Sequence, residues 1–169
     1  MVANGGIYQW PDGRKNMDTM TAVLDYGPLD KVEGGFQVVY SSRMTNSAGG
    51  TKEIYFSNGG SLNLDTNNIS ANGGLDADAA KAMGLAANQL ADFSLAPPAK
   101  VESGANTGAD PVTSAHMRNW MDCIRSRKAP NADVIAGYNH SVALCMTIAA
   151  LQTGKKITFD DAKQEVIIS

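Results

Sequence analysis

The amino-acid sequence predicts an α+β fold, with an open, largely antiparallel β-sheet and helices packed on one of its faces. Short segments that alternate apolar and polar residues fill the first 70 residues, and two long segments with helical spacing follow residue 110. A strand pattern then returns at the C-terminal end. Strands first and helices later, with a returning strand, are typical of an α+β layer.

The predicted strands are short and are separated by turn residues. In 18–26 the apolar residues fall on alternate positions, which suits a half-buried strand. The same alternation recurs in 34–42, 52–57 and 60–65. Asn58-Gly59-Gly60 lies between the last two segments and predicts a tight hairpin, because Asn and Gly tolerate positive φ. These segments together predict an antiparallel meander.

The first helical pattern is weak and a connector follows it. Apolar residues in Asp76–Phe93 have helix-like spacing and predict a helix there. Residues 94–110 contain Pro97-Pro98 and many small polar residues, which predict an irregular connector.

The second and third helical patterns are stronger. A helix opens at Asp110-Pro111, and its apolar stripe follows i, i+3, i+4, i+7 spacing at Met117, Trp120, Met121 and Ile124. A further helix over 132–153 is apolar around much of its circumference, so we expect it to be buried on two sides. Gly154 is placed as its C-cap, and 155–169 predict two short strands.

Length and composition restrict the class of protein. The 169 residues suffice for one domain, and we expect a single domain over 1–169. A net charge of −3 would repel a phosphate backbone, so no nucleic-acid partner is expected. No window resembles a membrane span or a signal peptide. We therefore expect no membrane partner and a cytoplasmic location by default, although a parent chain could carry an export signal.

Motifs for metal, cofactor and nucleophile chemistry are missing from the sequence. His116 and His140 stand 24 residues apart with no HExxH, which predicts no metal site. The glycine pairs form no GxGxxG and no phosphate loop, so no cofactor-binding residue is predicted. Cys123 and Cys145 form no CxxC, and we expect two buried free thiols.

A few polar residues are candidates for ligand binding. Loop 41–50 groups Arg43 and Asn46 at a strand end, where fixed donors could hold a hydroxylated ligand. An ordinary polar hairpin end would contain the same residues. Tyr40 precedes them, and His140 lies near the start of the last helix. We predict Tyr40, Arg43, Asn46 and His140 as substrate-binding residues and no catalytic residue.

Several segments match a known family in their order and spacing. His116–Gly137 is followed by AALQTGKKITFD at 149–160, and ANGGIYQWPDGRKNMDTMTAVLDY, YSSRMTN and IYFSNGGSLNLD stand upstream. This run resembles the C-terminal domain of Gfo/Idh/MocA-type oxidoreductases, and the upstream segments resemble that domain's sheet in members acting on sugars and cyclitols. The resemblance covers most of the chain outside about 66–110.

The resemblance implies a fold, a function and partners. Family members join an N-terminal Rossmann domain, which binds NAD or NADP and supplies a lysine from an EKP motif, to a C-terminal domain with a large open sheet. This sequence has no EKP, and neither His116 nor His140 has an Asp three residues later, as the family's catalytic histidine does. The resemblance therefore implies the substrate-side and oligomerisation domain of a NAD(P)-dependent sugar or cyclitol oxidoreductase. It further implies a homo-oligomer formed through the open sheet face, and no activity for this chain alone.

Two other functions remain open on the sequence alone. One is a stand-alone carbohydrate-binding or partner-subunit module without redox activity. The other is a cofactor-independent isomerase or lyase that uses His140 with Tyr138.

Overall fold

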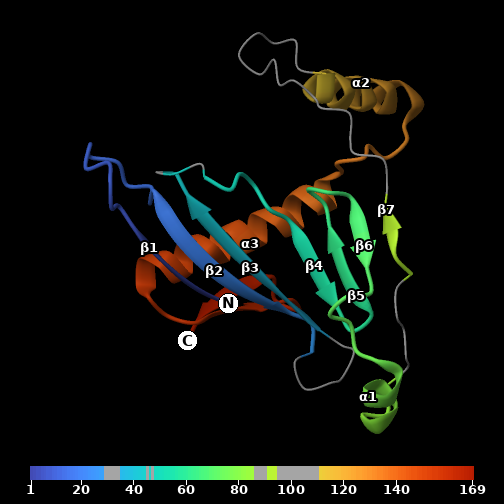
Figure 1. Ribbon diagram of the computed structural model, residues 1–169. Coiled ribbons are helices and arrows are strands. Elements are labelled where there is room, and N and C mark those ends of the chain that lie inside the picture. The colour runs from blue at the N-terminus through green and yellow to red at the C-terminus, as the bar shows by residue number, and fades with distance from the viewer. Residues whose placement is uncertain (29–34, 45, 47, 86–90, 95–110) are drawn as a thin grey trace. The chain divides into compact units, whose positions relative to one another are not determined.

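The computed structural model describes residues 1–28, 35–44, 46, 48–85, 91–94 and 111–169. Within these residues the chain is α+β, with open antiparallel sheets and helices, and this confirms the predicted class (Figure 1). The strands form three sheets, with the orders β1-β2-β3, β4-β5-β6-β7 and β8-β9. The chain divides into two compact units, 1–47 with 123–169, and 48–122. Each unit is described by itself, and the single domain over 1–169 stays a prediction.

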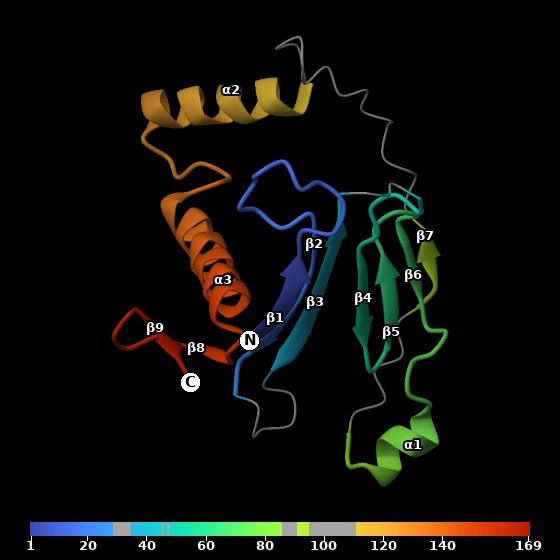
Figure 2. The ribbon, with the colours of Figure 1, turned by 90° about the vertical axis from the view of Figure 1, so that its left-hand side faces the viewer.

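The first unit is built on an antiparallel sheet of β1 (Val2–Gly6), β2 (Thr19–Tyr26) and β3 (Phe36–Arg43). Helix α3 (Val134–Thr153) lies along this sheet, as both ribbon views show (Figures 1 and 2). Ala22 is buried whereas its neighbour Thr21 is exposed, so α3 covers the face that carries Ala22. The opposite face carries Thr21, Val39 and Ser41, with Asp25 and Arg43 toward its two ends.

The core of this unit is small. Its buried apolar residues among those described are Met1, Ala22, Ala150 and Ile157. The backbones of Met1 and Ile157 exchange two hydrogen bonds of 2.9 Å, the Met1 ammonium donating one and the Ile157 N–H the other. These bonds join β1 to the hairpin of β8 (Ile157–Asp160) and β9 (Glu165–Ile168), which confirms the two predicted C-terminal strands.

Helix α3 ends at the predicted residue, Thr153, and begins at Val134, two residues after the predicted start. The Asp133 carboxylate accepts a 2.8 Å hydrogen bond from the Ala136 N–H, which satisfies a donor of the first turn. Gly154 ends the helix with φ of 66°, a left-handed conformation that favours glycine.

The expectation that α3 is buried on two sides is wrong. Its buried residues are Thr147 and Ala150, whereas Val134, Ile135 and Leu144 are exposed. The physical reason is geometric, because a three-stranded sheet covers one side of a helix only. α3 contains no charged side chain and is long and apolar enough to cross a membrane, although the sequence windows suggested no span. Length and composition alone are weak evidence for a membrane helix, and α3 packs on β1.

The second unit contains β4 (Ile54–Ser57), β5 (Gly60–Asn63), β6 (Asn68–Ser70) and β7 (Phe93–Ser94), all antiparallel. The predicted hairpin at Asn58-Gly59-Gly60 is confirmed, since Ser57 pairs with Gly60. A Cβ on Gly60 would lie 2.1 Å from the Ser70 carbonyl oxygen, and its φ is 139°. Only glycine fits there.

Helix α1 (Ala77–Ala82) is shorter than predicted. The Asp76 side chain caps it by accepting from the Ala79 N–H at 2.7 Å. The prediction of a helix as far as Phe93 is wrong, because Gly84 turns the chain with φ of 70° and Phe93 lies in β7. Residues 86–90, and the predicted connector apart from Ser94, lie outside the described residues.

Helix α2 (Pro111–Ser126) confirms the prediction that a helix starts at Pro111. Its apolar stripe is about half exposed at Met117, Trp120, Met121 and Ile124. The expectation of two buried thiols is wrong. Cys145 on α3 is exposed and Cys123 on α2 is half-buried, and both are free. Cys145 is exposed because, among the described residues, α3 packs on β1 and β8 with another of its sides.

Candidate functional site

A buried carboxylate organises the loop between β1 and β2. Asp18 is 1% exposed and accepts hydrogen bonds from three successive backbone N–H groups, those of Tyr8 (3.0 and 3.1 Å), Gln9 (2.9 Å) and Trp10 (3.2 Å). Hydrogen bonds from the Gln9 N–H and its neighbours hold the pKa of Asp18 below its usual value. A carboxylate so thoroughly solvated by backbone donors stays ionised although it is buried.

The same aspartate closes the loop through its backbone. The Asp18 N–H donates to the Gly6 carbonyl at 3.1 Å, and the Met44 N–H donates to the Asp18 carbonyl at 2.8 Å. These bonds bring the end of β1, the start of β2 and the end of β3 together at one end of the sheet. Residues 7–17, here called the 7–17 loop, project from that end. The hydrogen bond between Asp18 and Gly6 joins the two residues that flank the loop.

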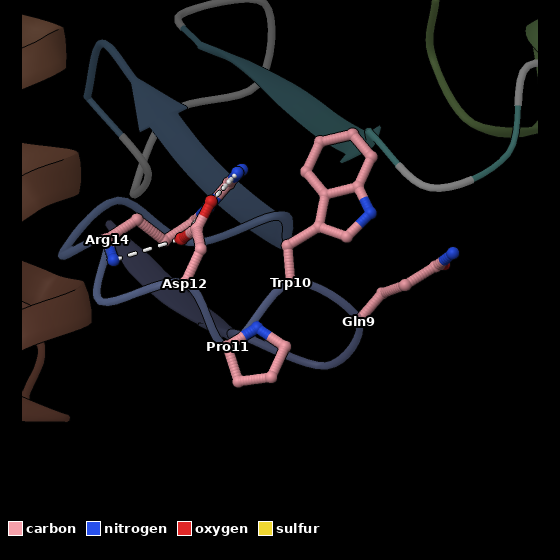
Figure 3. A pocket seen from close by; sticks show the side chains of 5 residues that line it. All are labelled: Gln9, Trp10, Pro11, Asp12 and Arg14. Atoms are coloured by element: carbon pink, nitrogen blue, oxygen red, sulfur yellow. Dashed lines mark hydrogen bonds and ion pairs between the residues drawn. The ribbon is translucent and has the colours of Figure 1, made fainter.

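The 7–17 loop forms an open hollow of about 510 Å³ lined by Gln9, Trp10, Pro11, Asp12 and Arg14. Gln9 and Asp12 lie on either side of Trp10 in the close view (Figure 3). Trp10 is 40% exposed, so part of its indole is available to a ligand. Residues 9–14 thus place an aromatic ring, an amide, a carboxylate and a guanidinium group around one hollow.

An ion pair fixes the polar side of the hollow. The Arg14 guanidinium donates from Nε to Asp12 Oδ1 at 2.8 Å and from Nη2 to Oδ2, and the Arg14 backbone N–H donates to Oδ1 at 3.1 Å. These bonds from Arg14 hold the pKa of the Asp12 carboxyl well below its usual range. Arg14 Cζ also lies 4.6 Å from the centroid of a Trp10 ring, a cation–π distance. Arg14 therefore contacts both Asp12 and Trp10, and these contacts favour one arrangement of the three side chains.

The residues predicted from sequence occupy other places. Tyr40 pairs with Ala22 and Arg43 pairs with Thr19, so the two side chains point to opposite faces of β3. Asn46 follows β3 and is exposed, and His140 is exposed on α3. The four residues therefore do not converge on one surface. Arg43 does lie at the same end of the sheet as the 7–17 loop, because its neighbour Met44 bonds to Asp18.

Sequence reasoning missed the 7–17 loop, which contains the described hollow. The signals were present as Trp10-Pro11-Asp12-Gly13-Arg14, where Pro and Gly indicate turns, and as Asp18 directly before a strand. Spacing alone cannot show that one carboxylate caps three amides eight to ten residues upstream. Among the described residues, no group of three or more His, Cys, Asp or Glu side chains could hold a metal ion.

No family model, no curated protein and no solved structure matches this chain. Function therefore rests on the residues and on the geometry described above.

Proposed function

We propose that this chain is the substrate-side and oligomerisation domain of a NAD(P)-dependent sugar or cyclitol oxidoreductase. The observation that carries the proposal is the 7–17 loop, which holds an aromatic and polar hollow on a backbone fixed by buried Asp18. The segment that forms this hollow also belongs to the upstream segments that resemble the sheet of this domain in Gfo/Idh/MocA-type members acting on sugars and cyclitols. NAD or NADP would be held by a dinucleotide-binding domain, since the 169 residues contain no glycine-rich phosphate motif.

The face of the first sheet that lies opposite α3 supports the oligomerisation part. Thr21 and Ser41 hydroxyls lie 3.3 Å apart on this face, and Val39 beside them is 63% exposed. Asp25 and Arg43 also lie on this face, but toward its two opposite ends, and the pairs Thr21–Ser41 and Val23–Val39 between them are uncharged. Packing of this central part against an identical one would bury apolar area without burying a charge. We propose a homo-oligomer formed through this face.

The oligomer has a direct test. Light scattering on the full chain should give at least twice the 17.8 kDa of the monomer. Val39→Lys should reduce the mass to that of the monomer, because it would place a charge in the interface. Val166→Lys, on β9, is the matched control and should leave the mass unchanged. A wild-type mass of one chain at millimolar concentration would overturn the oligomer.

A stand-alone carbohydrate-binding or partner-subunit module is the second candidate, and the exposed, preformed hollow favours it equally. The two candidates differ in assembly. Sugar binding by an oligomer supports the oxidoreductase domain, whereas sugar binding by a strict monomer supports the stand-alone module. In either case, titration with NADH should show no saturable binding by this chain. Micromolar NADH binding would contradict the assignment of the nucleotide site to another domain.

A further inference from the structure

We infer that the hollow of the 7–17 loop is a binding subsite for one uncharged, polyhydroxylated ring, a neutral sugar or a cyclitol. The inference rests on the proposed function for the general class of ligand. It adds the place, which differs from the predicted Tyr40, Arg43, Asn46 and His140, and it adds the charge of the ligand.

The first argument is preorganisation. Exposed loops ordinarily lose conformational freedom on binding, and that loss weakens affinity. Here the backbone of Tyr8, Gln9 and Trp10 is already held by Asp18. Because the backbone positions are fixed, the points from which the three side chains project are fixed as well. Two of the three are exposed aromatics, with Tyr8 72% and Trp10 40% exposed.

The second argument is the chemistry of the lining. The face of an indole ring carries partial negative charge, and the C–H groups on one face of a sugar ring carry partial positive charge, so the two surfaces attract. The Gln9 amide can donate and accept hydrogen bonds, and the Asp12 carboxylate accepts them. Hydroxyl groups around a ring need both kinds of partner. The volume of about 510 Å³ is ample for a single ring.

The third argument is charge. Arg14 would attract a carboxylate or phosphate ligand if its guanidinium were free. Its Nε and Nη2 groups already bond to Asp12, and its Cζ lies 4.6 Å from the centroid of a Trp10 ring. An anionic ligand at this place would also meet the ionised Asp12 carboxylate, and the two like charges would repel. A neutral ligand meets no such repulsion, so the Asp12–Arg14 pair selects against acid sugars.

The test is ligand-observed NMR on the full chain with three probes: myo-inositol, D-glucose and D-glucuronate. At least one neutral probe should bind in the millimolar range, and D-glucuronate should bind at least threefold more weakly. Trp10→Ala should weaken binding of the neutral probe about tenfold, which corresponds to about 1.4 kcal/mol. Gln9→Ala is a second variant with the same expected direction, and its side chain has no structural role in the Asp18 contacts.

The chain provides a matched control. It contains two tryptophans, and Trp120 on α2 is 50% exposed and lies outside the hollow. Trp120→Ala should therefore leave binding unchanged. In Trp120→Phe, moreover, Trp10 is the one remaining tryptophan, and its fluorescence should change saturably with the neutral probe.

The outcomes separate this inference from the proposed function. Sugar binding that persists in Trp10→Ala and Gln9→Ala would place the ligand elsewhere and overturn the subsite, while the proposed function would stand. Tighter binding of D-glucuronate would overturn the assignment of a neutral ligand. Absence of binding by all three probes at 100 mM would overturn the inference, whereas the oligomeric mass would still test the proposed function independently.

Discussion

Two regions of the first unit expose large apolar side chains, and different interactions hold the backbone in each region. In the 7–17 loop, Tyr8 and Trp10 are exposed on a backbone that the buried Asp18 ties down. In α3, Val134 and Ile135 are exposed on an ordinary helix whose own hydrogen bonds and caps suffice. A specific polar scaffold beneath exposed aromatics is typical of a ligand site. Exposed apolar residues on a regular element are typical of a surface that another protein surface covers.

The largest expected effect comes from removing the scaffold. Asp18→Ala leaves the N–H groups of Tyr8, Gln9 and Trp10 without their acceptor, and water must enter to replace it. We expect the melting temperature to fall by about 5–10 °C, measured by circular dichroism. Asp25→Ala is the matched control, because Asp25 is exposed on the same sheet and its carboxylate accepts a hydrogen bond from the Gln37 side chain rather than from backbone N–H groups of a loop. A fall of similar size in both variants would show that Asp18 has no special role.

The stability conferred by Asp18 should depend on pH in one direction. Its pKa in the folded chain is lowered from 3.8, so the unfolded chain takes up the proton first as pH falls. The contribution is therefore present above about pH 4 and is lost as pH falls through the folded pKa. We expect the difference in melting temperature between wild type and Asp18→Asn to be largest near neutral pH and to shrink below about pH 4. A difference that grows on acidification would contradict this sign.

The smallest expected effects are at two glycines, one within α3 and one at its C-terminal end. The backbone conformation of each glycine sets the sign of the effect. Gly137 and Gly154 both have open space where a Cβ would stand, but Gly154 has φ of 66° and Gly137 is helical. Gly137→Ala should stabilise the chain by about 0.5–1 kcal/mol. Gly154→Ala should destabilise it by about 1 kcal/mol, since the left-handed conformation opposes a Cβ. Chemical denaturation measures both, and equal effects would show that the caps of α3 are unimportant.

The sequence predicted the local features of the fold. Alternation predicted β2, β3, β4 and β5, and Gly154 was predicted as the C-cap of α3 because a cap acts on neighbouring residues. The N-cap Asp133 was not predicted. Helix α1 was predicted too long, because the apolar spacing after Met83 outweighed Gly84 as a stop signal. The burial of α3 was predicted wrongly for a different reason. Hydrophobicity shows that a surface needs covering, but not whether the same chain covers it.

The candidate site was less accessible to sequence reasoning. Arg43 was predicted as a ligand residue from its strand-end position, and it does lie at the same sheet end as the 7–17 loop. The loop itself depends on a carboxylate that meets amides eight to ten residues away. Such a contact follows from the way the chain turns back on itself. Residue type and spacing do not encode it, because any aspartate before a strand looks the same.

The most direct test of a preformed loop is amide hydrogen exchange at Tyr8, Gln9 and Trp10 in the unliganded chain, measured by NMR. We expect these three amides to exchange slowly, at rates close to those of the β2 amides, because a buried carboxylate accepts from each of them. The amides of Gly13 and Lys15, in the same loop, serve as the internal reference and should exchange faster. Exchange of all five amides at the rate of an unstructured peptide would show that the loop is not preformed. That result would contradict the assignment of its hollow as a ligand site.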